Sequence, residues 1–244
     1  VDCYECFEYS DAAHRVFNLR PPAVGLDQVE ATPLSVVAMV MFLLATVTFD
    51  GFSATPEWIR VQSLFITTFA GLNSPFLNGI VIANTMGLLA FPLGFAALFW
   101  SFSRMMYWAV GNYPPAVPTL IGAFVFSLIP IALAYNYAHF LSLLLIQGQQ
   151  IIALASDPFG AGWDLFGTAE YLINIRVTNA RFIWIFSVTV IVVGHIVAVY
   201  LAHIQAIRLY PSQKLVLRSQ LPMLVLMVVY TVVSLWIVSR PITE

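Results

Sequence analysis

Residues 182–207 read FIWIFSVTVIVVGHIVAVYLAHIQAI, without a single Asp, Glu, Lys or Arg. At about 1.5 Å per residue this stretch makes a helix of about 39 Å, which exceeds the roughly 30 Å hydrocarbon core of a bilayer. Polar and apolar residues do not alternate along it, as they would in a strand of a membrane barrel. The stretch therefore predicts a transmembrane α-helix.

Four further uncharged stretches are distributed along the chain. Residues 33–49, 80–102 and 221–238 each suit one span, whereas residues 118–154 are longer than one crossing needs. We expect this long helix to tilt and to kink at Pro130, which lacks the backbone N–H that a helix interior uses. Because lipid cannot satisfy the open edge of a sheet, we predict an all-α polytopic transmembrane helix bundle with about five spans.

Residues 61–79 decide whether the number of spans is five or six. This stretch is uncharged, but residues that favour turns interrupt it. They are Gly71, Asn73, Ser74, Pro75 and Asn78. We interpret the stretch as a segment that lies at the membrane interface, and a sixth span results if it inserts.

The composition excludes most soluble classes of protein. The chain has 244 residues, with ten Lys and Arg against twelve Asp and Glu, and charged residues make up 9% of it. Ordinary soluble domains carry about 25% charged residues, so too little polar surface is present here to cover a water-exposed domain. A net charge of −2 offers no basic surface to nucleic acid. We expect the partners to be lipids and other protein subunits.

The charges also predict domains and orientation. Residues 1–31 are polar and acidic and form an extramembrane lead-in, followed by the bundle at 32–240 with an aromatic and Gly-rich loop at 155–180. With five spans, six cations share the side of the lead-in and four lie opposite. The six are Arg15, Arg20, Arg104, Arg208, Lys214 and Arg218, and the four are Arg60, Arg176, Arg181 and Arg240. The excess favours a cytoplasmic N-terminus.

Both cysteines of the chain lie in the lead-in, as Cys3 and Cys6. A Cys-x-x-Cys spacing lets two thiolates bind one metal ion or cluster, so zinc or an iron–sulfur cluster is a candidate. Two more ligands are needed, and His14 is the nearest, so the others must come from elsewhere. The alternative is a free or disulfide-linked pair without metal.

Three histidines fall inside predicted spans, His139 in the third and His195 and His203 in the fourth. Ionisable residues at such depth usually face the bundle interior and mark function. Together with Tyr200, which lies between His195 and His203, they are candidate ligands or hydrogen-bond partners for haem b or a quinone. Interhelical hydrogen bonding is the simpler alternative.

Depth argues against a haem held by His139 and His195. Counted along their helices, the two residues lie about 30 Å and about 18 Å from the same membrane face. A difference of about 12 Å is too large for two axial ligands of one iron unless the kink at Pro130 shortens the third helix. A polar stripe that binds a quinone head group, relays protons or shares a porphyrin with another subunit fits better.

The loop at 155–180 suggests a second chemistry. Its carboxylates at Asp157 and Asp164, with Glu170, would form a divalent metal site if His139 joined them, and such a site would be hydrolytic. Alternatively, the acids pair with Arg176 and Arg181.

Several runs resemble those of bacterial multi-pass proteins labelled fenitrothion hydrolase. They are residues 138–141, 145–149, 156–160, 163–169, 194–203 and 217–223, and the similarity extends over essentially the whole chain from Cys3. The resemblance implies a bacterial inner-membrane protein of which this chain is the carboxyl-terminal half. It carries over no catalytic residue.

Two functions therefore follow as hypotheses. The first is an integral membrane subunit of an electron-transfer or metalloenzyme complex, which anchors partners and serves a quinone or haem. The second is a membrane-bound metal-dependent hydrolase of apolar organophosphate esters, with His139, Asp157 and Asp164 as its catalytic residues. A permease is disfavoured because the sequence shows no inverted repeat.

Overall fold

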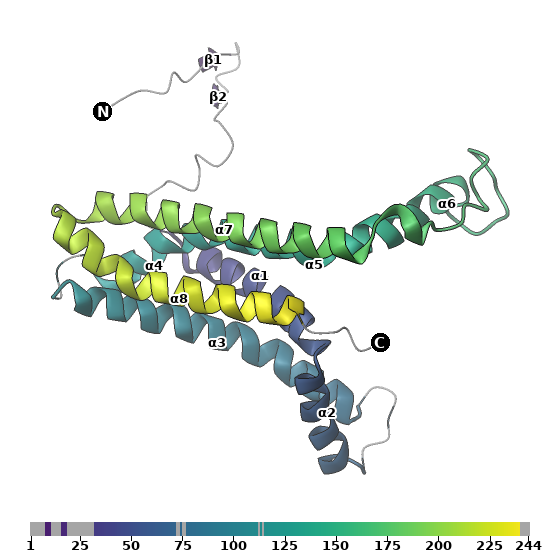
Figure 1. Ribbon diagram of the computed structural model, residues 1–244, viewed down its shortest axis with the longest axis horizontal. Helices are drawn as coiled ribbons and strands as arrows, with labels where there is room; N and C mark the ends of the chain where they lie inside the picture. Colours follow the sequence, from purple (N-terminus) through teal and green to yellow (C-terminus); the bar gives the residue numbers. More distant parts are fainter. Residues whose placement is uncertain are drawn as a thin grey trace.

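The computed structural model describes residues 8–10, 16–18, 32–71, 74, 77–111, 113 and 115–239. Apart from a short antiparallel pair of strands, β1 and β2, the fold is a bundle of α-helices (Figure 1). The elements are β1 (Glu8–Ser10), β2 (Val16–Asn18), α1 (Leu34–Ser53), α2 (Pro56–Thr68), α3 (Gly79–Ala109), α4 (Val117–Val125), α5 (Ile129–Ile146), α6 (Gln150–Ser156), α7 (Ala180–Leu209) and α8 (Gln213–Ser239). Cys3, Cys6 and His14 lie outside the described residues.

Within these ranges the chain has five helical segments long and apolar enough to cross a membrane, which confirms the predicted architecture. They are α1, α3, the continuous rod from Val117 to Ser156, α7 and α8. The helices extend beyond the uncharged stretches. For example, α8 begins at Gln213 and includes Lys214 and Arg218, because a helix continues into the headgroup region where charges are tolerated.

The segment that we expect at the membrane interface forms a separate short helix, which begins earlier than expected. α2 starts at Pro56, where the side chain of Thr55 accepts a hydrogen bond from the Trp58 backbone N–H. The indole of Trp58 and the amide of Gln62 both donate to Asn84 Oδ1 on α3, at 2.9 and 2.8 Å. α2 has 13 residues, too few to cross the hydrocarbon core, so it is not among the spans. It packs against α3 through these hydrogen bonds.

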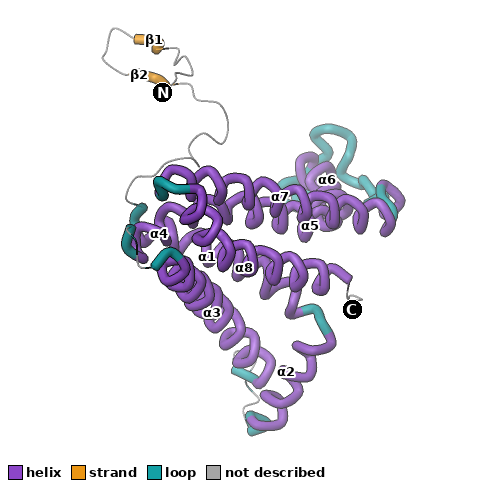
Figure 2. The backbone as a smooth tube through the Cα atoms, turned by 60° about the vertical axis from the view of Figure 1, so that its left-hand side comes forward, coloured by secondary structure: helices purple, strands orange, loops and turns teal. Residues whose placement is uncertain are grey.

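The third span is interrupted just before Pro130, as predicted. A 3₁₀ turn at Phe126–Leu128 separates α4 from α5, and a second turn at Gln147–Gln149 separates α5 from α6. The whole rod has 40 residues, or about 60 Å at helical rise. With α7 it forms an arm that reaches past the rest of the bundle (Figures 1 and 2).

α5 and α7 pack closely because small residues face each other. A Cβ added at Gly194 would lie 2.4 Å from Ala134 Cβ and 3.0 Å from the Pro130 carbonyl oxygen. The hydroxyl of Ser187 donates to the Ala138 carbonyl at 3.1 Å. Small residues at helix interfaces permit this approach of the backbones in membranes.

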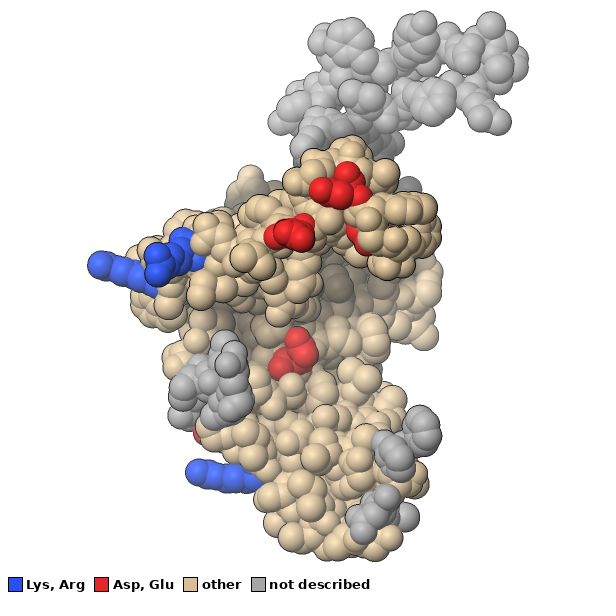
Figure 3. All heavy atoms as spheres, turned by 90° about the vertical axis from the view of Figure 1, so that its right-hand side faces the viewer, with Lys and Arg blue, Asp and Glu red and all other residues tan. Residues whose placement is uncertain are grey.

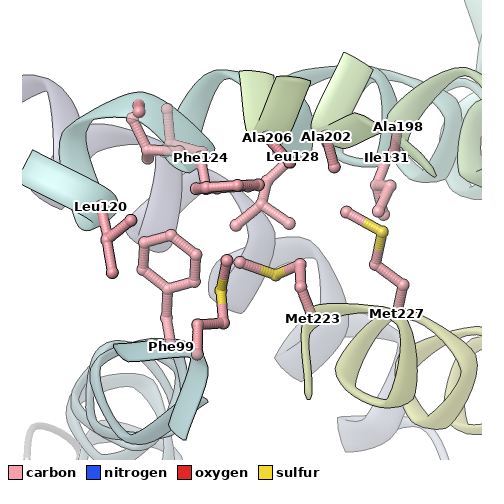
Figure 4. Packing of buried hydrophobic residues seen from close by; sticks show 14 of the residues in the cluster. Phe99, Leu120, Phe124, Leu128, Ile131, Ala198, Ala202, Ala206, Met223 and Met227 are labelled. Carbon is pink, nitrogen blue, oxygen red and sulfur yellow. The ribbon is translucent and has the colours of Figure 1, made fainter. Parts of the chain in front are cut away.

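The main apolar core lies where α1, α3, α4, α7 and α8 meet. Phe99, Leu120 and Phe124 pack together, and Met223 and Met227 of α8 lie in the same cluster as three alanines of α7 (Figure 4). These alanines are Ala198, Ala202 and Ala206. The long methionine side chains fill the space that the small residues leave.

α1 is held against the third span at two levels. Thr32 Oγ1 donates to the Gly122 carbonyl at 3.0 Å, and Asp50 contacts His139 at 2.7 Å. Beyond the second contact, α5 and α7 continue in one direction while α2 and the start of α3 turn away in another (Figure 2). α1 therefore lies against the third span as far as Asp50, and beyond that residue the helices diverge. This end of the molecule is called the open end of the bundle below.

Candidate functional site

The open end of the bundle holds a histidine–carboxylate pair. His139 Nε2 lies 2.7 Å from Asp50 Oδ2, and the two side chains are 27% and 60% exposed. His139 comes from α5 and Asp50 from the last turn of α1, two elements 89 residues apart. The predicted candidate His139 is therefore already engaged by a carboxylate that local spacing did not suggest.

One turn deeper, Tyr135 lies beneath His139. Their rings are parallel at a centroid distance of 6.3 Å, and both flank Gly51 of α1. A Cβ at that glycine would lie 3.2 Å from the Tyr135 hydroxyl and 3.6 Å from His139 Cε1. Tyr135 is 2% exposed, and its hydroxyl has no hydrogen-bond partner.

Tyr230 of α8 occupies the next position inward, with its ring 6.4 Å from that of Tyr135. Its hydroxyl lies 2.8 Å from Thr48 Oγ1, and the Thr48 hydroxyl is 2.6 Å from the Leu44 carbonyl. The single hydroxyl proton of Thr48 goes to that carbonyl, because a carbonyl can only accept. Tyr230 is therefore the donor to Thr48.

His195 of α7 adjoins Tyr230 at a ring distance of 5.9 Å. Its Nδ1 lies 2.7 Å from the Ile191 carbonyl, so Nδ1 carries a proton and donates it. In the neutral ring Nε2 is then an acceptor, and this buried nitrogen has no partner. Tyr135, Tyr230, His195 and Thr48, with the Asp50–His139 pair at the open end, are called the polar core below.

The other predicted residues of α7 lie outside the polar core. His203 Nδ1 is 2.8 Å from the side-chain nitrogen of Gln220 on α8, nearer the α7–α8 turn. Tyr200 is mostly exposed and directed away from the bundle. Because Tyr200 is five residues after His195, it is rotated by about 140° around the helix, and the structure does not bring these two side chains together.

The acidic loop residues serve the loop itself. Asp157 accepts hydrogen bonds from the backbone N–H groups of Ala161 and Gly162, at 2.9 and 2.8 Å. Asp164 accepts from the Ala169 N–H at 3.0 Å. Figure 3 shows acidic side chains gathered on the upper part of the face beyond α6, apart from the basic ones. Among the described side chains these acids form no ion pair with the loop arginines.

The hydrolytic arrangement is not assembled in the described structure. Asp157 lies 18 residues beyond His139, about 27 Å along the helical rod, and His139 contacts Asp50 instead. In the described ranges, no three His, Cys, Asp or Glu side chains are placed to hold a metal ion. The metal site predicted from His139, Asp157 and Asp164 is therefore not formed.

A haem between His139 and His195 would also fit poorly. The Ser187–Ala138 hydrogen bond sets the level of α7 against α5, and His195 lies eight residues further on, about 12 Å away along the helix. This agrees with the depth difference expected from counting.

Comparison with known protein families, curated proteins and solved structures finds no match to this chain.

Proposed function

We propose that this chain is an integral membrane subunit of an electron-transfer complex and that its polar core serves a quinone. The observation that carries the proposal is the pair of unsatisfied buried atoms, Tyr135 Oη and His195 Nε2, on either side of Tyr230. Each such group costs about 1–3 kcal/mol. Ionisable groups kept inside a membrane bundle generally serve a ligand or a proton.

A quinone suits these groups better than a haem does. Quinones move in the lipid phase and exchange protons when they are reduced or oxidised. His195 Nε2 can accept a proton, and Tyr230 adjoins it. A haem would find the Nε2 of His139 already engaged by Asp50.

We infer that the α7–α8 turn faces the cytoplasm of a bacterial inner membrane. At that end the helices carry four cations, Arg104, Arg208, Lys214 and Arg218, and no Asp or Glu. The opposite end has Asp50, Glu57, Asp157, Asp164 and Glu170 with three arginines. This distribution follows the positive-inside rule, which puts the Asp50–His139 pair on the outer side and the start of α1 inside.

Isolation of the assembly tests the proposal. The full chain is purified in a mild detergent, the co-purifying polypeptides are identified, and bound quinone is extracted and quantified. We expect a quinone and at least one polypeptide that carries a redox centre, including a partner that meets the Cys3–Cys6 segment. An isolated protein with no quinone, no redox partner and no haem or iron–sulfur absorption would contradict the proposal.

A variant pair locates the activity within the chain. His195→Asn should lower quinol turnover of the isolated complex by about a hundredfold, the usual range for loss of a proton-accepting group. His203→Asn is the matched control, since it removes an imidazole from the same helix outside the polar core. Equal losses in both variants would show that the polar core is not the quinone site.

The hydrolase hypothesis has its own test. It requires a metal site near His139 and Asp157, and no contact among the described side chains favours one. Ester cleavage by the purified chain that is abolished in both His139→Ala and Asp157→Ala would support it. The proposed quinone function predicts instead that neither variant alters any cleavage of an organophosphate.

A further inference from the structure

A cavity of about 190 Å³ lies on the side of Tyr230 that faces away from the α7 seam. α1, α3 and α8 surround it, and Ile131 of α5 closes the back. Figure 4 shows Ile131 and Met227, two of its lining residues, directed toward each other. None of the histidines of the polar core lines it.

The walls of the cavity are hydrocarbon. Thr48 and Tyr230 are its two hydroxyl-bearing lining residues, and their hydroxyls are bonded to each other. Phe91, Phe95 and Phe99, spaced four residues apart on α3, form one wall. An engineered apolar cavity of about 150 Å³ accepts benzene, so this one has room for about seven or eight carbon atoms.

The cavity opens toward lipid between α3 and α8. Leu98 and Val229 at its rim are about half exposed, and Val233 is 40% exposed. A ligand that reaches it arrives from the bilayer and keeps its polar part out of the cavity itself, because the walls offer that part no free hydrogen-bond partner. The occupant is therefore one apolar chain of a larger amphiphile.

We propose that this cavity binds the isoprenoid tail of a quinone, next to the head group. The three phenylalanine side chains on one wall offer aromatic contacts to the double bonds and methyl branches of such a chain. A stiff chain also loses less torsional freedom on binding than a saturated acyl chain does. The position behind Tyr230 places the tail beside the polar core, and in this respect the inference rests on the proposed quinone function.

Binding to the full chain in lipid nanodiscs tests this site. The probes are a ubiquinone with two isoprene units, a ubiquinone with a saturated ten-carbon tail, and the tail-less head group. We expect the isoprenoid probe to bind most tightly and the tail-less probe at least about tenfold more weakly, because two or more methylene equivalents lose their burial. Equal affinity for the isoprenoid and saturated probes would overturn the preference for an isoprenoid tail.

Two neighbouring substitutions separate the possible results. Val233→Phe fills the rim of the cavity and should weaken the isoprenoid probe by about tenfold. Val232→Phe is the control, since Val232 is 61% exposed and does not line the cavity. Neither change disturbs a fully buried position, so both variants should fold.

Each remaining outcome has a distinct meaning. If the probe binds wild type and both variants equally, the tail lies elsewhere and the inference fails while the quinone function stands. If Val233→Phe releases a co-purified phospholipid and leaves quinone affinity unchanged, the occupant is an acyl chain and the inference fails. If no probe binds even to wild type, the proposed function fails together with it.

Discussion

α5 presents two faces that are offset by a single residue. Pro130, Ala134 and Ala138 meet α7 in a seam of small side chains, where Gly194 leaves no room for a methyl group. Starting one residue later, Ile131, Tyr135 and His139 meet α1 and α8. The first face is closely packed. The second carries the Tyr135 hydroxyl, which has no hydrogen-bond partner, and the partly exposed Asp50–His139 pair.

The difference separates the contacts that hold the bundle together from the groups that the proposed quinone function would use. In lipid there is little hydrophobic drive between helices, so close packing of small residues provides the association. The seam with α7 supplies this packing. Polar groups without partners are costly, and the other face keeps one where a quinone-serving function would use it.

Substitutions in the seam with α7 should lower the unfolding free energy more than substitutions on the other face of α5. Gly194→Ala places a methyl group 2.4 Å from Ala134 Cβ, so α5 and α7 must separate, and we expect a loss of about 2 kcal/mol of unfolding free energy. Unfolding in a denaturing detergent, followed by circular dichroism, measures it. Gly94→Ala is the control, because nothing lies within 4 Å of the added methyl. Equal stability of the two variants would mean that the seam is not tightly packed.

Removing the hydroxyl that is bonded should cost stability. Tyr230→Phe leaves Thr48 without its donor and should lower the unfolding free energy by about 1 kcal/mol. The same unfolding assay measures the change. A variant as stable as wild type would show that the Tyr230–Thr48 hydrogen bond contributes nothing.

Removing the unpartnered hydroxyl should have the opposite sign. Tyr135→Phe takes away a buried group that has no hydrogen bond, so we expect a gain of up to about 1 kcal/mol together with slower quinol turnover. Measured beside Tyr230→Phe, it contrasts two tyrosines on adjacent helices. A loss of stability would indicate that the Tyr135 hydroxyl finds a partner in the bilayer-embedded protein.

The Asp50–His139 pair should contribute less to the unfolding free energy than the packing at Gly194 or the Tyr230–Thr48 hydrogen bond. Both side chains are partly exposed, and exposed pairs contribute about 0.2–1 kcal/mol. A double-mutant cycle with Asp50→Asn and His139→Gln isolates the coupling free energy. A coupling well above 1 kcal/mol would mean that the open end of the polar core is shielded from water.

Tyr210 lies just past the end of α7, and its ionisation should affect the stability of the protein only at alkaline pH. Burial raises the pKa of the Tyr210 phenol to about 12, against about 10 in an unfolded chain. Its contribution to stability is complete below pH 10 and is lost as the pH rises toward 12. Tyr210→Phe should be as stable as wild type or slightly more stable at neutral pH, because this hydroxyl also has no hydrogen-bond partner, and should lose less stability between pH 10 and 12. Identical pH profiles would contradict the burial of this hydroxyl.

The sequence predicted the spans because the relevant property is local. The absence of charge over about 20 residues identifies a membrane helix without reference to the rest of the chain, and the five spans are confirmed. The helix ends were less predictable. Arg218 precedes the last uncharged stretch and Lys214 lies before it, yet both belong to α8, since charge marks the end of the hydrocarbon and not the end of the helix.

The partner of His139 could not be read from local spacing. The sequence analysis grouped His139 with Asp157 and Asp164, which follow it along the chain, whereas Asp50 lies 89 residues before it. A usable signal was present: Asp50 lies about 26 Å from the start of the first predicted span and His139 about 30 Å from the start of the third, and alternate spans run in the same direction. Comparing depths between such spans would have suggested the pair. Tyr230 and Thr48 carried no such signal, because single hydroxyls are common in membrane helices.

The lengths of the five spans also bear on the membrane that suits the protein. α1 has 20 residues, about 30 Å at helical rise, whereas α3, α7 and α8 have 31, 30 and 27. Because α1 is the shortest span, a hydrocarbon core thicker than about 30 Å should strain α1 before the others, at a fraction of a kcal/mol per ångström of mismatch. Reconstitution into lipids of graded acyl length should show stability falling in the longest chains.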